Sequence, residues 1–303
     1  MSRYVDVNIY FGKKKLRMTG VIVAAVVLAI LACICVILFI PPRGFRDLDD
    51  CREKLAQNRY IIHAGGYVTD PDGNVLSYTN TLDSLYNCYE KGNRISEFDL
   101  MRTSDGKIVC AHDSEEEDEW AYGVKDAGTK DEPPTLSEFK SAKFEGTLST
   151  MSFDDLADFM ADHGDFYIVT DVKDDNIGIC TKIRQEYPWL VNNVIVQIYH
   201  SDEYDQIREL GFDYIIYTLY NTTEEELQPD TLAEFIASHD LAGITFWEDF
   251  PEQYADSFDT LTGMGVPLFV HTVNDKEKMK FYFAAGMTGI YTDVTDKGEQ
   301  YEF

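Results

Sequence analysis

Residues 94–113 read RISEFDLMRTSDGKIVCAHD. Glu97 and Asp99 lie two positions apart in a strand-like segment, so their side chains share one face of the strand. Two carboxylates on one face repel each other unless a cation lies between them or one takes up a proton, which makes the pair a candidate site. The Ser-Asp-Gly turn that follows reverses the chain, and the next apolar run brings His112 back toward the carboxylates. The alternative interpretation is a hairpin with a solvated acidic face and a chance histidine.

Length and charge limit the classes of protein to which the chain can belong. Its 303 residues suffice for one (β/α)8 barrel, because such barrels commonly use about 250 residues as a single domain. The formal charge is −28, and residues 1–43 hold six basic side chains and one aspartate, so removing their +5 leaves −33 on the rest. A surface this acidic repels phosphates, so we expect no nucleic-acid partner. An anionic substrate would need a local cation.

The N-terminal region predicts a membrane anchor. Residues 21–40 are twenty apolar residues without a charge, enough to cross a hydrocarbon core of about 30 Å. Three lysines and an arginine precede this run, so the positive-inside rule predicts a cytoplasmic segment over 1–19, a single transmembrane helix over 20–41, and the remaining chain outside the cell. A cleaved signal peptide is the alternative, but the run is long for one and no small-x-small cleavage site follows it.

Beyond a linker and lead-in helix at 42–58, residues 59–303 alternate short β-branched runs with stretches of helical periodicity. This alternation predicts an α/β fold, a closed parallel TIM (β/α)8 barrel. An open doubly wound sheet would also fit, but no Gly-rich phosphate fingerprint follows the first strand. The strands are predicted at 60–64, 95–100, 166–173, 194–199, 214–219, 243–246, 268–272 and 289–292.

One segment, which we call the excursion (residues 114–150), is too long for a simple connection. Long connections inside a compact domain are usually functional, so we predict a lid or cap over the mouth of the barrel.

Polar and charged residues gather where the predicted strands end. In a barrel of this kind the carboxyl ends of the strands meet at one face, where chemistry takes place. The convergence of histidines, carboxylates and a lysine there favours a single site over chance. The residues at or just after strand ends are His63, Glu97, Asp99, Asp171, Lys173, Gln197, His200, Trp247, Glu248, His271, Asn274 and Asp293.

A family resemblance rests on the order and spacing of short motifs. They resemble the successive motifs of the glycerophosphodiester phosphodiesterase family, across about residues 60–298, most clearly at both ends. The resemblance implies a TIM barrel of the phosphatidylinositol phospholipase C-like type that cleaves phosphodiesters with a divalent metal. The motifs are IHAGG at 62–66, TNTL at 79–82, EFD at 97–99, DGKIV at 105–109 leading to His112-Asp113, DVK at 171–173, TVND at 272–275 and GIYTD at 289–293.

The resemblance also implies roles for individual residues. It supplies two acid/base histidines, three acidic metal ligands and a phosphate-contacting lysine. We add two candidate substrate contacts, an asparagine and a tryptophan, although packing is the simpler interpretation of the tryptophan. The acid/base histidines are His63 and His112, and the metal ligands are Glu97, Asp99 and Asp171. The phosphate-contacting lysine is Lys173, and the added substrate contacts are Asn80 and Trp247.

The chain departs from the family pattern at three positions. Ala64 stands where the family has an arginine, and Thr79 stands where it has the glutamate of Glu-Asn-Thr. The third acidic ligand, Asp171, is one methylene shorter than the usual residue. Without the arginine a bidentate phosphate contact is lost, and Lys173 replaces it only as a point charge.

The residue types themselves suggest a mechanism. Three carboxylates suit a hard cation, Ca²⁺ or Mg²⁺, better than zinc. One histidine would take a proton from the attacking hydroxyl and the other would protonate the leaving oxygen. The expected substrates are glycerophosphodiesters from lipid headgroups or from a glycerophosphate polymer of the envelope. The alternatives are a catalytically silent barrel that binds phosphodiesters or a protein, and a phospholipase that acts on intact lipid.

Overall fold

The structure is a computed structural model that describes residues 8–11, 14–17, 26–27, 44–116, 118–172 and 175–301. The chain divides into two compact units, residues 1–42 and residues 43–303. In the first unit β1 (Asn8–Phe11) and β2 (Lys14–Arg17) form an antiparallel pair. No helix among the described residues is long and apolar enough to cross a membrane. The predicted anchor at 20–41 lies outside the described residues except for 26–27, so it stays a prediction.

The second unit contains a closed barrel of eight parallel strands. The last strand pairs with the first, and the first pairs with the second, so the eight parallel strands form a closed ring and the doubly wound alternative is wrong. All eight predicted strands are present, which confirms the (β/α)8 barrel. In barrel order they are β3 (Tyr60–Ile62), β6 (Ile95–Arg102), β11 (Tyr167–Asp171), β12 (Val194–Ile198), β13 (Ile215–Thr218), β14 (Gly243–Trp247), β15 (Leu268–His271) and β16 (Gly289–Thr292).

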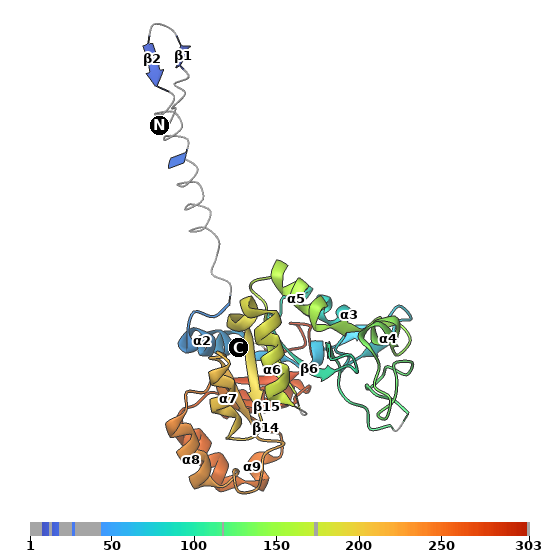
Figure 1. Cartoon of the computed structure of the whole chain (residues 1–303). Coiled ribbons are helices and arrows are strands. Elements are labelled where there is room, and N and C mark those ends of the chain that lie inside the picture. The colour runs from blue at the N-terminus through green and yellow to red at the C-terminus, as the bar shows by residue number, and fades with distance from the viewer. Residues whose placement is uncertain are drawn as a thin grey trace. The chain divides into compact units, whose positions relative to one another are not determined.

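Helices surround the strands and cover their outer face (Figure 1). Several begin at a capping box, in which the N-cap hydroxyl accepts a hydrogen bond from the third helical N–H, as Thr81 and Ser152 do. The barrel helices are α3 (Leu82–Glu90), α5 (Phe153–Asp162), α6 (Asn176–Glu186), α7 (Glu203–Glu209), α8 (Pro229–Ser238), α9 (Phe250–Gln253), α10 (Ala255–Met264) and α11 (Lys276–Ala284), with 3₁₀ turns η1 (His63–Gly65) and η2 (Pro188–Asn193).

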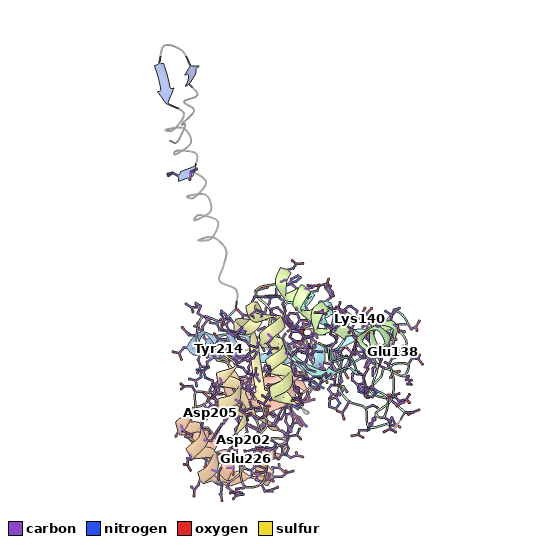
Figure 2. The ribbon with its side chains drawn as sticks, in the orientation of Figure 1. Glu138, Lys140, Asp202, Asp205, Tyr214 and Glu226 are labelled. Carbon is purple, nitrogen blue, oxygen red and sulfur yellow. The ribbon has the colours of Figure 1, made fainter. Side chains whose placement is uncertain are left out.

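The segment before the first strand closes the amino-terminal end of the barrel. It contains α2 (Leu48–Asn58) and, ahead of it, the buried Phe45. The Phe45 ring stacks on Tyr167 with centroids 4.2 Å apart and meets Tyr214 edge-on at 4.8 Å. The Tyr214 hydroxyl, on the residue labelled in Figure 2, donates a hydrogen bond to the Phe45 carbonyl oxygen at 3.1 Å. The lead-in segment is therefore part of the barrel core.

We expect Phe45→Ala to lower the free energy of unfolding by about 3–5 kcal/mol, because the change removes a ring from a closed core and leaves a cavity. Urea denaturation followed by circular dichroism measures the change. Phe281→Ala is the matched control, since that ring on α11 is 65% exposed and its removal leaves no cavity. Equal stability of the Phe45 variant and the control would show that the segment does not belong to the core.

The excursion builds a small lobe of its own. Strand β7 (Ile108–Cys110) pairs antiparallel with β6 on one side and with β10 (Met151–Ser152) on the other. Between β7 and β10 in the sequence lie α4 (Leu136–Ser141) and the antiparallel pair β8 (Lys143–Phe144) and β9 (Leu148–Ser149). A further short antiparallel pair, β4 (Val68–Thr69) and β5 (Val75–Leu76), comes earlier in the chain, before α3. Figure 1 shows α4 and its green loops at one side of the barrel, and Figure 2 labels Glu138 and Lys140 on this helix. The apolar core of the lobe includes Trp120, Ala121, Val124, Phe139, Phe144 and Leu148.

Candidate active site

Three carboxylates meet at the carboxyl ends of two neighbouring strands. Glu97 and Asp99 lie on β6 and Asp171 ends β11, in a register that places Asp171 beside Asp99. Their side chains are buried, with exposed fractions of 1%, 4% and 7%. Each residue offers an oxygen, and these oxygens lie within 4.8 Å of one another. We call these three residues the acidic cluster. Glu97 and Asp99 meet there because, as predicted, their side chains share one face of the strand.

Two loop residues hold the β6 carboxylates in place. The Ala64 N–H donates to Glu97 Oε2 at 2.9 Å. Asn80 Nδ2 donates to Asp99 Oδ2 at 2.8 Å, and Asn80 Oδ1 accepts from the Asp99 N–H at 3.0 Å. Ala64 and Asn80 both have left-handed φ angles, 48° and 52°, and the Asn80 N–H donates to the Ala64 carbonyl oxygen at 3.1 Å. The hydrogen bonds of Asn80 orient Asp99, and the predicted substrate contact of Asn80 stays a prediction.

Two tyrosines donate hydrogen bonds to the third carboxylate. The Tyr199 hydroxyl donates to Asp171 Oδ1, and the Tyr220 hydroxyl donates to Oδ2 at 2.6 Å. Burial, and then the charge on Asp171, raises the pKa of both phenols well above the ordinary value. Both hydroxyls therefore stay protonated and fix the orientation of Asp171. An ionised carboxylate has about four lone-pair sites, so these bonds leave room for a cation.

We expect Tyr199→Phe and Tyr220→Phe each to weaken divalent-cation binding by about 10–100-fold, the usual effect of removing a group that orients a ligand. Isothermal titration calorimetry with Ca²⁺ and with Mg²⁺ measures the affinity. Tyr217→Phe is the matched control, because the hydroxyl of this buried β13 residue bonds to Thr222 instead. Wild-type affinity in both Asp171-partner variants would exclude the orienting role.

His63 follows β3 and is held by a carboxylate. Its Nδ1 lies 2.8 Å from Asp293 Oδ1, and an ionised carboxylate only accepts, so Nδ1 carries the proton and Nε2 the lone pair. Asn274 Nδ2 donates to Asp293 Oδ2 at 2.6 Å, and Asn274 Oδ1 accepts from the Asp293 N–H at 2.8 Å. Two side chains, Asn274 after β15 and Asp293 after β16, thus orient the imidazole.

His112 lies just after β7 and is oriented through the same nitrogen. Its Nδ1 lies 2.7 Å from the Asp113 carbonyl oxygen and 3.2 Å from the Asp113 carboxylate. Both groups accept, so Nδ1 again carries the proton. His112 also lines a cavity of about 210 Å³ together with Asp99 and Asp171. The returning hairpin therefore brings His112 to the acidic cluster, as the sequence predicts.

An aromatic ring links the two histidines. Tyr78 stacks on His63 with centroids 4.8 Å apart and planes at 24°, and its centroid is 5.0 Å from that of His112. Burial, and then the charges of Asp99 and Glu97, raises the pKa of the Tyr78 phenol, so it stays protonated. Nothing in the sequence marked Tyr78 as a residue of the site. Asp293 was visible as a strand-end residue, but its pairing with His63 was not.

The other predicted site residues are placed as follows. Trp247 ends β14, and its Nε1 donates to Gln253 at 3.2 Å. Its ring packs on Phe250 and Tyr254, so the side chain lies against α9 and the residue after it. Its substrate contact stays a prediction. Lys173 lies outside the described residues. The cavity beside the acidic cluster extends to Trp120 of the excursion, which therefore forms one wall of the site; a lid over the mouth stays a prediction.

The acidic cluster fits a hard divalent cation. It is the one group of metal-binding residue types found among the described residues, and all its donors are carboxylate oxygens. Oxygen-only donor sets suit Ca²⁺ or Mg²⁺, whereas zinc sites usually include cysteine or histidine.

A closed parallel barrel with two oriented histidines and an acidic cluster suited to a divalent cation at its carboxyl-terminal face has the architecture of a hydrolytic barrel. The Glycerophosphoryl diester phosphodiesterase family model matches residues 65–297, and the chain belongs to this family. It is a phosphoric diester hydrolase of the glycerophosphodiester phosphodiesterase type. No curated protein matches the sequence.

Solved structures share the fold at low sequence identity. A glycerophosphoryl diester phosphodiesterase from Parabacteroides distasonis is 16% identical over 84% of this chain and 90% of its own, with a TM-score of 0.63. A glycerophosphodiester phosphodiesterase from Thermotoga maritima is 19% identical over 78% and 95%, with a TM-score of 0.54. A phosphodiesterase from Oleispira antarctica, solved with the product sn-glycerol-3-phosphate, is 17% identical over 79% and 94%, with a TM-score of 0.57.

Proposed function

We propose that the protein hydrolyses glycerophosphodiesters to a glycerol phosphate and an alcohol, with Ca²⁺ or Mg²⁺ held by the acidic cluster. The observation that carries this proposal is the meeting of three buried carboxylates, two of which, Asp99 and Asp171, line one cavity together with His112. The sn-glycerol-3-phosphate in the Oleispira antarctica structure supports a glycerophosphate moiety in the substrate. When bound, the cation would supply positive charge that offsets the negative charges of the phosphate and of this acidic protein.

The histidines would move the protons. His63, hydrogen-bonded to Asp293, is suited to take the proton from the attacking hydroxyl at Nε2, because the carboxylate stabilises the imidazolium that results. His112, entering the step as the imidazolium with protons on both nitrogens, would then give its Nε2 proton to the leaving oxygen. In a glycerol or inositol ester a neighbouring hydroxyl of the substrate can attack first and give a cyclic phosphate, which water then opens.

A substrate panel tests the proposed class. The panel contains deacylated glycerophosphodiesters, intact diacyl phospholipids and a glycerophosphate polymer, each with and without divalent cation. We expect the deacylated diesters to be cleaved fastest, with glycerol phosphate as product. Faster cleavage of diacyl lipid would identify a phospholipase instead.

We further propose that a single transmembrane helix at residues 20–41 anchors the barrel on the outer side of the cell membrane. The uncharged run at 21–40 and the basic residues before it support this orientation. Lipid headgroups or an envelope polymer would then be the source of substrate.

Protease added to intact cells is expected to remove residues 44–303 and to spare the N-terminal segment, because the anchor would place only the barrel outside. Immunoblotting against tags at the two ends measures this, with permeabilised cells as the control. Protection of both ends in intact cells would mean that the barrel lies inside.

A further inference from the structure

The ring of Tyr78 contacts both histidines of the site. It lies nearly parallel to the His63 imidazole at 4.8 Å and tilted by 50° to the His112 imidazole at 5.0 Å. A hydrogen bond at Nδ1 limits the rotation of an imidazole, but the angle of the bond can vary, so the ring can still tilt. Contact with an aromatic face narrows this tilt, and here the single ring of Tyr78 packs on both imidazoles.

The backbone at Tyr78 is in a conformation that bulky residues rarely adopt. Its φ is 59°, in the left-handed region, and Asn80 two residues later has a φ of 52°. Such outliers persist where surrounding contacts fix them, and they gather at functional sites. Here the fixing contacts are the two hydrogen bonds between Asn80 and Asp99 and the bond from the Asn80 N–H to Ala64. The loop that orients a carboxylate of the acidic cluster therefore also sets the position of Tyr78.

We propose that Tyr78 is a positioning residue for His63 and His112, with its ring as a common wall that sets the direction of both Nε2 atoms. This inference rests on the acid/base roles proposed above. The ring performs the positioning, so the hydroxyl is dispensable and phenylalanine can replace tyrosine.

Kinetics of three variants test the proposal. Tyr78→Ala is expected to lower kcat by about 10²-fold with little change in KM, the size expected for a misplacement of about 1 Å. Tyr78→Phe is expected to keep the wild-type kcat. Tyr86→Ala is the matched control, because this tyrosine on α3 is 51% exposed and contacts Phe159 rather than the site. Equal losses in the Ala and Phe variants would overturn the proposal in favour of a role for the hydroxyl.

Double variants separate positioning from general damage. If Tyr78 acts through the histidines, the Tyr78→Ala loss shrinks when His63→Ala or His112→Ala is already present, because residues that act as a unit are not additive. A full and additive loss in both backgrounds would overturn the proposal.

A readout independent of turnover distinguishes failure of this inference from failure of the proposed function. The imidazole C–H signals of His63 and His112 are assigned by NMR from the two alanine variants, among six histidines in the chain. Because loss of the tyrosine ring current alone would shift both signals, the orientation is measured by nuclear Overhauser contacts between each imidazole and residues other than Tyr78. We expect these contacts to change in Tyr78→Ala and to persist in Tyr78→Phe and Tyr86→Ala. Unchanged contacts in Tyr78→Ala would overturn the positioning role even if the enzyme is active, and changed contacts in an inactive protein would uphold it.

Discussion

His63→Ala and His112→Ala are each expected to lower kcat for a glycerophosphodiester by about 10²–10⁴-fold, the usual contribution of a general acid or base. Both imidazoles carry the proton on Nδ1, because His63 faces the Asp293 carboxylate and His112 faces the Asp113 carbonyl oxygen. Nε2 is therefore the nitrogen that exchanges a proton with the substrate in each: it takes one up in His63 and gives one up in His112. Steady-state kinetics of the wild type and of the two variants measure the loss. The wild-type rate should follow a bell-shaped pH profile, because one histidine must be free of its proton while the other carries one.

The control for this prediction is another histidine of the same chain. His239 follows α8, where its Nδ1 lies 2.8 Å from the Phe235 carbonyl oxygen and its ring stacks on Phe235. His239→Ala should therefore leave kcat unchanged. A non-hydrolysable phosphodiester should still bind to both site variants, since the acidic cluster remains. Turnover that survives both site substitutions would remove the histidines from the mechanism.

Glu97→Gln and Asp99→Asn are expected to abolish divalent-cation binding and, with it, turnover. Each change keeps the shape of the side chain but removes a charge from a buried set of three carboxylates whose oxygens lie within 4.8 Å. Neutral amide oxygens attract a divalent cation much less strongly than carboxylates do. Calorimetric titration with Ca²⁺ and Mg²⁺ measures binding directly, without dependence on substrate.

Asp50→Asn provides the matched control for the acidic cluster. Asp50 is also buried, but it pairs with Arg46 at the start of α2, at the opposite end of the barrel from the acidic cluster. Its replacement can cost stability, yet cation affinity should not change. Unchanged affinity in the Glu97→Gln, Asp99→Asn double variant would place the cation elsewhere.

The sequence was sufficient for the barrel because each strand is a short buried run of β-branched residues bounded by turns, and eight such runs alternate with helices. It was also sufficient for Glu97 and Asp99, since alternation along a strand fixes which side chains share a face. Asp171 and His112 followed from their positions at strand and hairpin ends. These inferences need only local pattern and the rule that parallel strands end together.

Other parts of the site depend on contacts that no local pattern records. Tyr199 and Tyr220 reach Asp171 from 28 and 49 residues away, and nothing in their flanking residues shows that they turn inward. Tyr78 faces the histidines because of a left-handed φ, which is a property of the folded loop. Trp247 packs on the aromatic rings of Phe250 and Tyr254 on the helix side, and its substrate contact stays a prediction.

Cation-dependent hydrolysis can be followed by phosphorus NMR of the wild-type protein with a deacylated glycerophosphodiester, recorded with Mg²⁺ or Ca²⁺ and again with a chelator. We expect a phosphomonoester signal to grow as the diester signal declines, only when the cation is present, and we expect His63→Ala to suppress this growth. Undiminished turnover in chelator would contradict the metal site. An unchanged diester signal for every glycerophosphodiester, with cation present, would contradict the hydrolase itself and favour a barrel that only binds.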